Sequence, residues 1–147
     1  MKNTNRARAI AYRASVAEYL GTELGLGDQI SARPYLVRLS DQLAEGYEQG
    51  QILGLADVLI NVHVDLTFEV ARQVERSRAE AEMGDKSIYF SVQQRNKATF
   101  FSDPSSSLVF TSAECMVTII QRLLKLAAYE KEEAATDAAE VTPAAAA

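Results

Sequence analysis

The sequence predicts an α+β fold, with N-terminal helices, an antiparallel β-meander of about four strands and a C-terminal helix packed on the sheet. Three observations predict it: helical spacing of apolar residues near the N-terminus, two-residue alternation in the middle of the chain, and a second helical stripe after residue 111. The length of 147 residues suits one domain, and 48% hydrophobic with 24% charged residues is typical globular usage.

The first segment, from Thr4 to Leu24, has helical periodicity. Tyr12, Val16, Leu20 and Leu24 follow one another at steps of four, which places them on one face of an amphipathic helix. Glycines at positions 21, 25 and 27 can supply the left-handed backbone conformation that closes a helix.

A loop is expected to about Arg33, followed by a second helix that is capped by Ser31 and stops near Gly46 or Gly50. The Ser31 hydroxyl suits a helix cap, and Pro34 fits the first turn, where a missing amide hydrogen is no loss. The residues that would form its apolar stripe are Leu36, Leu39, Leu43 and Tyr47.

The segment from Val58 to Val70 alternates with a period of two. Every even-numbered residue in it is apolar, whereas the odd positions from 61 onward are polar: Asn61, His63, Asp65, Thr67 and Glu69. A helix would also gather polar residues at steps of four, but it would carry Ile60, Val64 and Phe68 towards that polar side. We therefore predict a long strand with one apolar face and one face in water.

Residues 71–83 are rich in Arg, Glu and Ala, which fits either a short helix or a solvated extension of the strand into a long hairpin. Beyond them, Ile88, Phe90 and Val92 alternate with other residues and predict a second strand.

A turn at residues 95–97 leads into an expected third strand at Thr99–Ser102. Asp103–Ser106 then has the acceptor and proline positions of a type I turn, and a fourth strand is expected at Leu108–Phe110. Strands joined this tightly favour antiparallel pairing.

Thr111 and Glu114 have the spacing of a capping box and predict the start of the last helix. Its apolar face would consist of Met116, Ile119, Ile120, Leu123, Leu126 and Ala127. Beyond Tyr129 the composition changes to Ala, Glu, Asp and Thr, which is typical of a disordered tail. We therefore predict one globular domain over residues 1–129 and an acidic, Ala-rich tail over 130–147.

The two ends of the chain carry opposite charge. The formal net charge is −5, but residues 1–17 sum to +4 through Lys2, Arg6, Arg8 and Arg13, and residues 130–140 sum to −4. Such ends suit head-to-tail contacts between molecules.

Two residues invite a catalytic interpretation. His63, the one histidine, lies near Asp65 and would be a general base oriented by a carboxylate, although a surface or edge-strand histidine is the simpler interpretation. Cys115 lies at the start of the last helix, where a thiolate is stabilised, but Glu114 opposes this and a small half-buried hydrophobe is favoured. The glycines match no phosphate-binding loop, and we expect no enzyme, cofactor or metal.

A single cysteine permits no disulfide within the chain and favours a reducing compartment. No apolar run follows the basic N-terminus, and no stretch approaches the length of a membrane span. A cytoplasmic protein is expected.

Basic groups beside aromatic residues offer an alternative function. Lys2, Arg6 and Arg13 share one helical face, and Arg95 with Lys97 forms a basic turn near aromatic residues at positions 89, 100 and 101. Such surfaces bind single-stranded nucleic acid. The pI of about 4.9 opposes this, because phosphate binding generally needs a basic surface.

The run from Leu36 to Gln94, with LVRLSDQLAEG, VDLTFEVARQVER and DKSIYFSV, resembles the trypsin-co-occurring domain of bacterial peptidase-linked conflict systems. The chain departs from that pattern in its N-terminal helix and in its long final helix, where the family ends in a strand. The resemblance implies an antiparallel helix-and-sheet module that binds partners and is not catalytic.

Together these features predict a non-enzymatic protein–protein interaction or assembly protein that self-associates, such as a virion or accessory component of a bacteriophage. The residues expected at contacts are Arg6, Arg8 and Arg13 at one end and Glu132, Glu133 and Asp137 at the other. The alternative is a small nucleic-acid-binding protein that uses the basic N-terminal helix and the turn at Arg95 and Lys97.

Overall fold

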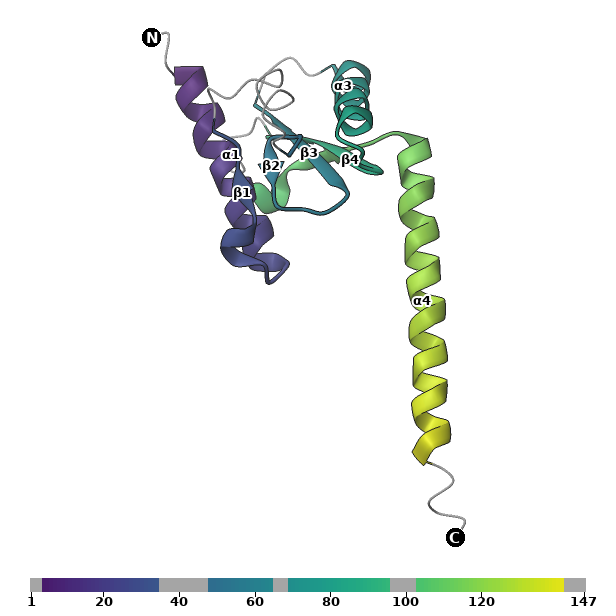
Figure 1. Cartoon of the computed structure of the whole chain (residues 1–147). Helices are drawn as coiled ribbons and strands as arrows, with labels where there is room; N and C mark the ends of the chain where they lie inside the picture. Colours follow the sequence, from purple (N-terminus) through teal and green to yellow (C-terminus); the bar gives the residue numbers. More distant parts are fainter. Residues whose placement is uncertain (1–3, 35–47, 65–68, 96–102, 142–147) are drawn as a thin grey trace. The chain divides into compact units, whose positions relative to one another are not determined.

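The computed structural model describes residues 4–34, 48–64, 69–95 and 103–141 (Figure 1). The chain divides into two compact units, Met1–Ser112 and Ala113–Ala147. The first contains the sheet and the second a single described helix, and each is described by itself.

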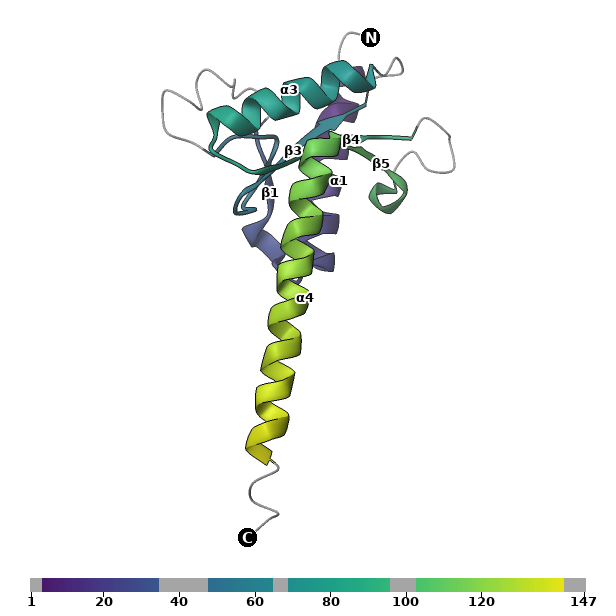
Figure 2. The same ribbon diagram turned by 90° about the vertical axis from the view of Figure 1, so that its right-hand side faces the viewer.

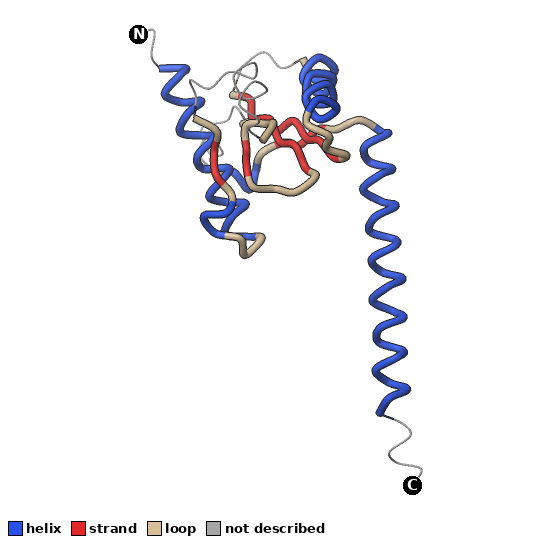
Figure 3. Tube along the Cα trace, viewed as in Figure 1, coloured by secondary structure: helices blue, strands red, loops and turns tan. Residues whose placement is uncertain are grey.

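The first unit is a mixed helix-and-sheet fold, as predicted (Figure 3). Its elements are, in order, α1 (Thr4–Glu23), η1 (Gly27–Gln29), β1 (Ser31–Ala32), β2 (Ile52–Leu53), β3 (Val58–His63), α3 (Val70–Met83), β4 (Ile88–Gln93), η2 (Pro104–Ser106) and β5 (Leu108–Phe110).

The predicted antiparallel meander is wrong at its centre. The strands lie in the order β1-β2-β3-β4-β5, and β3 pairs with β4 in parallel, from Val58 opposite Ile88 to His63 opposite Gln93. The other pairs are antiparallel. The physical reason is α3: residues 71–83 form a helix and not a hairpin, and a helix between two strands returns the chain to the same end of the sheet.

The predicted strand from Val58 to Val70 is also too long, because β3 ends at His63 and Val70 already begins α3. Residues 65–68 lie outside the described residues. The alternation identified the strand correctly, but its polar face is not in water: Asn61 is 2% exposed and His63 is 8% exposed. Both faces of β3 are covered.

The predicted second helix is not capped by Ser31, since Ser31 and Ala32 form β1 and pair with Leu53 and Ile52. Residues 35–47, which hold its proposed apolar stripe, lie outside the described part of the chain, as does the third strand expected at residues 99–102.

The tight turn expected at Asp103–Ser106 is present as η2, where the Asp103 carboxylate accepts a hydrogen bond from the Ser105 amide at 3.0 Å. The strand that follows, β5, is also confirmed, and it pairs with β4.

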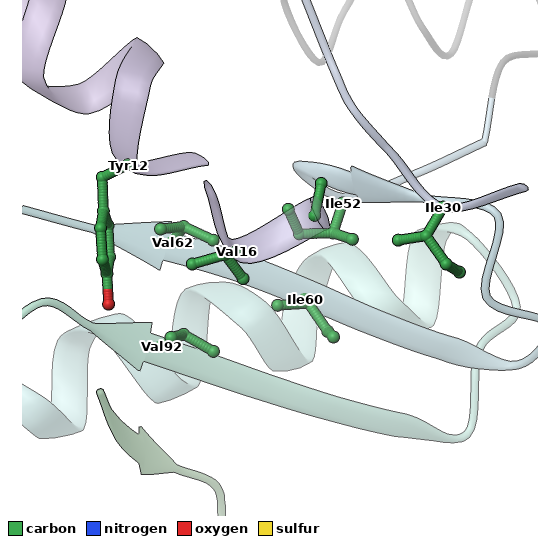
Figure 4. Close-up of a cluster of buried hydrophobic side chains, with 8 residues drawn as sticks. Tyr12, Val16, Ile30, Ile52, Ile60, Val62 and Val92 are labelled. Atoms are coloured by element: carbon green, nitrogen blue, oxygen red, sulfur yellow. The ribbon is translucent and has the colours of Figure 1, made fainter. Parts of the chain in front are cut away.

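The hydrophobic core lies between α1 and one face of the sheet (Figure 4). Tyr12 and Val16 of α1 are each 3% exposed and join Ile60, Val62 and Val92 of β3 and β4. Burial of each such aliphatic side chain contributes about 1.5–3 kcal/mol. The helical stripe predicted from steps of four is therefore confirmed at these positions, whereas Leu24 lies beyond the helix and is 53% exposed.

The opposite face of the sheet is covered by α3 (Figure 2). The odd-numbered residues of β3 and β4, among them Leu59, Asn61 and Ser91, are buried there. The loops at the start of these strands are held by Lys86, whose ammonium is 2.6 Å from Glu48 and also donates to the carbonyls of Leu55 and Val58.

The second unit contains α4 (Ala113–Val141), a helix of 29 residues. The capping box predicted at Thr111 is wrong, because the helix begins after Ser112 and the Thr111 hydroxyl donates to the Tyr89 carbonyl at 2.6 Å. The segment expected to be a disordered tail from residue 130 is helical as far as Val141, which agrees with the high helix propensity of its alanines. The expected packing of this helix on the sheet, and the domain boundary at residue 129, stay predictions.

Candidate interaction surface

The basic residues predicted at contacts do not form one exposed face. Arg13 is 7% exposed, and its guanidinium donates to the Arg33 carbonyl at 3.1 Å. Arg8 is half-buried and donates to the Gln94 side chain at 2.9 Å and to the Val64 carbonyl at 3.0 Å. These two arginines therefore connect α1 to the rest of the first unit.

The other predicted basic groups have different positions. Arg6 is exposed on α1, and Arg95 is half-buried two residues after β4. Lys97 lies outside the described residues. Among the described residues, the Arg8–Gln94 hydrogen bond places α1 beside the residue that precedes Arg95, but Arg13 is buried and joins no exposed basic surface.

A polar layer is buried between α3 and the sheet, at the position where the sequence predicted a wet face. The Asn61 amide donates to the Ser77 hydroxyl at 3.2 Å and to the Glu80 carboxylate at 2.8 Å. The Ser77 and Ser91 hydroxyls are 2.7 Å apart, and Arg76 donates to Glu80 at 3.1 Å. Because these groups bond to one another, they fix α3 on the sheet and do not form an open site.

The charged residues of this layer, Glu80 and Arg76, also act electrostatically on Arg33. Burial lowers the pKa of the Arg33 guanidinium, the Glu80 carboxylate raises that pKa, and the Arg76 guanidinium lowers it further. A carboxylate within the layer thus partly offsets the burial of a cation at its edge.

The two residues with a catalytic interpretation are both buried. His63 is 8% exposed on the central strand β3, so the surface or edge-strand position expected for it is wrong. Cys115 is a free thiol and 2% exposed, which agrees with its interpretation as a small hydrophobe. Within the described residues, no group of three His, Cys, Asp or Glu side chains is placed to hold a metal ion.

A hollow of about 390 Å³ lies between α1 and the η1–β1 segment. Its walls combine short apolar side chains with hydroxyls and two carboxylates, from Ala14, Ala17, Glu18, Thr22, Asp28 and Ser31. The sequence patterns gave no signal for it, because alanine and threonine at a helix surface carry no periodic signature. We assign this hollow no chemistry.

Among the described residues, seven of the thirteen exposed large hydrophobic side chains are on α4. We use the name apolar stripe for Ala113, Val117, Ile120, Leu124, Ala127, Ala134 and Ala138. With Lys131 included, these positions recur at alternating steps of four and three, which is the spacing of a helix-pairing seam. Met116 and Leu123 flank the stripe and widen it.

The large side chains of this surface are exposed. Val117 is 49% exposed, Ile120 46% and Leu124 66%, and the flanking Met116 and Leu123 are 50% and 58% exposed. Within the described residues of the second unit α4 is the sole element. A single helix cannot bury its own apolar stripe, so this surface is suited to binding another element.

The acidic residues predicted at contacts, Glu132, Glu133 and Asp137, are exposed on α4. At 100° per residue they lie outside the apolar stripe, and Glu133 shares the opposite side of the helix with Arg122 and Lys125. The apolar face predicted from the sequence for this helix shares only Ile120 and Ala127 with the stripe and was assigned to the sheet. Val117 and Leu124 were not part of it, so the stripe was missed as a candidate interface.

No helix among the described residues is long and apolar enough to cross a membrane. Comparison with protein-family models, curated proteins and solved structures finds no match to this chain. The resemblance to the trypsin-co-occurring domain stays a prediction, and the parallel β3–β4 pair differs from the antiparallel module that it implied.

Proposed function

We propose that this protein is a non-enzymatic, self-associating assembly protein and that α4 is the element through which it associates. The observation that carries the proposal is the exposed apolar stripe on α4, in a unit that has no other described element to cover it. A virion or accessory component of a bacteriophage belongs to this class of protein.

A second copy is a better partner for the stripe than the sheet of the same chain. Over β3 and β4 one face of the sheet packs against α1 and the other against α3. The chain therefore offers little uncovered sheet surface at its centre, whereas a second α4 offers an identical stripe with matching spacing.

The energies favour a reversible association. Full burial of a large aliphatic side chain contributes about 1.5–3 kcal/mol, and the five large residues at the stripe are about half exposed, so a pair of helices gains roughly 8–15 kcal/mol. Association costs about 4–15 kcal/mol in lost freedom of motion. Because these ranges overlap, we expect association that depends on protein concentration.

The test is sedimentation equilibrium over a range of protein concentrations. The wild type should exceed the monomer mass of 16.1 kDa. A double variant in the stripe, Ile120→Glu with Leu124→Glu, should be monomeric because it places charges in the interface. A matched control on the polar side, Thr118→Glu with Gln121→Glu, adds the same charge and should associate like the wild type.

A wild-type protein that stays monomeric at the highest concentration and at low salt would overturn the proposal. Tyrosine fluorescence of the first unit, which contains buried Tyr12 and Tyr89, checks that each variant remains folded. Equal association of the stripe variant and the control would also overturn it, because the stripe would then not be the interface.

The nucleic-acid alternative has less support. It needs exposed basic groups, but Arg13 is buried and Arg8 hydrogen-bonds within the first unit. We therefore favour assembly.

A further inference from the structure

We infer that two α4 helices pair antiparallel, each placing its acidic C-terminal half beside the N-terminal half of the other copy. This inference rests on the proposed function and adds the orientation of the partner. It comes from two independent features of α4: the distribution of charge along the helix and the distribution of side-chain size along the apolar stripe.

Charge is divided unevenly along α4. From Ala113 to Ala128 the charged residues are Glu114, Arg122 and Lys125, and the net charge is +1. From residue 129 to residue 141 five acidic residues stand against Lys131, and the net charge is −4.

A parallel pair would place these two acidic halves side by side over their full length, and it would place Lys131 in the seam opposite Lys131 of the second copy. Like charges at such positions are destabilising. Arg122 and Lys125 lie on the side of α4 away from the stripe, so they make no direct ion pair across the seam. An antiparallel pair nevertheless sets each acidic half alongside the half of the other copy whose net charge is +1, and it aligns the helix dipoles favourably.

Side-chain size changes along the same direction. The large stripe residues Val117, Ile120 and Leu124 lie in the N-terminal half, whereas the C-terminal half carries Ala134 and Ala138. A parallel pair would set large residues against large ones at one end and alanine against alanine at the other, so the helices would have to diverge. In an antiparallel pair centred near residue 129, Ile120 and Leu124 face Ala138 and Ala134, and Ala127 faces Lys131, so the distance between the axes varies less along the contact.

Distances between spin labels test the orientation in the full chain. Cys115→Ser removes the native thiol, and this background must first associate like the wild type. A label at Ala139→Cys then reports on the C-terminal half. In an antiparallel pair centred near residue 129, the two labels are about 20 residues apart along the axis, or roughly 30 Å. In a parallel pair they are separated by one interhelical distance, about 10 Å, plus the label arms.

A crossed experiment reverses the expectation. A mixture of Gln121→Cys and Ala139→Cys chains should give a short distance between positions 121 and 139 in an antiparallel pair. In a parallel pair the same labels are 18 residues apart, or about 27 Å. The expected result is a long 139–139 distance together with a short 121–139 distance. The Ile120→Glu and Leu124→Glu changes, added to the labelled chains, should abolish both distances.

The opposite pattern, or a mixture of both, overturns the antiparallel orientation while the association itself, and with it the proposed function, stands. A monomer in the sedimentation experiment removes both. The two failures are therefore distinguishable.

Discussion

Replacement of Glu80 by alanine tests whether the buried polar layer under α3 stabilises the first unit. Glu80 is 4% exposed. Its carboxylate accepts hydrogen bonds from the Asn61 amide at 2.8 Å and from the Arg76 guanidinium at 3.1 Å. Its removal leaves one N–H of the buried Asn61 amide without an acceptor.

The magnitude follows from these contacts. A hydrogen bond to a charged group contributes about 1.5–3 kcal/mol, which applies to the bond from Asn61. The pair with Arg76 spans one helical turn, and the Arg76 side chain is 62% exposed, so the pair adds only about 0.3–0.5 kcal/mol. The higher helix propensity of alanine returns a few tenths of a kcal/mol. We therefore expect Glu80→Ala to lower the free energy of unfolding by roughly 2–3 kcal/mol.

A matched control is available on the same helix. Glu82→Ala makes the same chemical change, but the Glu82 side chain is 69% exposed and its partner Arg78 is 43% exposed, so the expected loss is at most about 0.5 kcal/mol. Urea unfolding followed by tyrosine fluorescence measures the free energy of unfolding of both variants. Equal losses in the two variants would refute the argument that burial of this layer makes its hydrogen bonds matter.

Two further predictions concern backbone geometry and pH. Gly54→Ala should lower the free energy of unfolding by more than about 2 kcal/mol. The backbone of Gly54 has a φ of +95°, and an added Cβ would lie 1.8 Å from the Gln29 carbonyl oxygen. Gly25→Ala, at a φ of +66° with nothing within 4 Å, should lose only about 1–2 kcal/mol in the same urea titration. Burial raises the pKa of Tyr12, an effect that Asp103 reinforces and the hydrogen bond with Ser107 partly opposes. The folded state thus holds this proton more tightly than the unfolded chain, so its contribution to stability is complete below about pH 10 and is lost as the pH rises further. The melting temperature of the wild type should therefore fall more steeply above that pH than that of Tyr12→Phe, and parallel curves would contradict this.

The elements that could be predicted from the sequence are those whose pattern is local. Tyr12 and Val16 lie at helical spacing and are buried on α1, and the alternation around Ile60 and Val62 identified β3. Periodicity reports which residues share a face, and each such face is a property of a few consecutive residues. The helix α4 itself was predicted for the same reason.

The errors concern relations between distant segments. The alternation at Asn61 and His63 shows which residues share a face, but burial of that face depends on Ser77 and Glu80 of α3, which supply its hydrogen bonds. The direction of pairing between β3 and β4 likewise depends on whether residues 71–83 form a helix, and their composition left that open. Arg13 was assigned to the surface because its acceptor, the carbonyl of Arg33, lies 20 residues further along the chain, directly after β1.

The relative strength of apolar and charged contacts decides which surface of the molecule is the better interface. Opposite charges at the two ends suggested head-to-tail contacts, but exposed ion pairs contribute only about 0.2–1 kcal/mol each and are screened by salt. The apolar stripe of α4 offers several times that energy, so charge is better suited to setting the orientation of partners than to holding them together. Lys131 fits this division, because a single lysine at a seam position weakens pairing while it restricts register and the number of helices. A stripe with an apolar residue in place of Lys131 would bind more tightly but less selectively. The acidic C-terminal half of α4 would then have no positive charge within the seam.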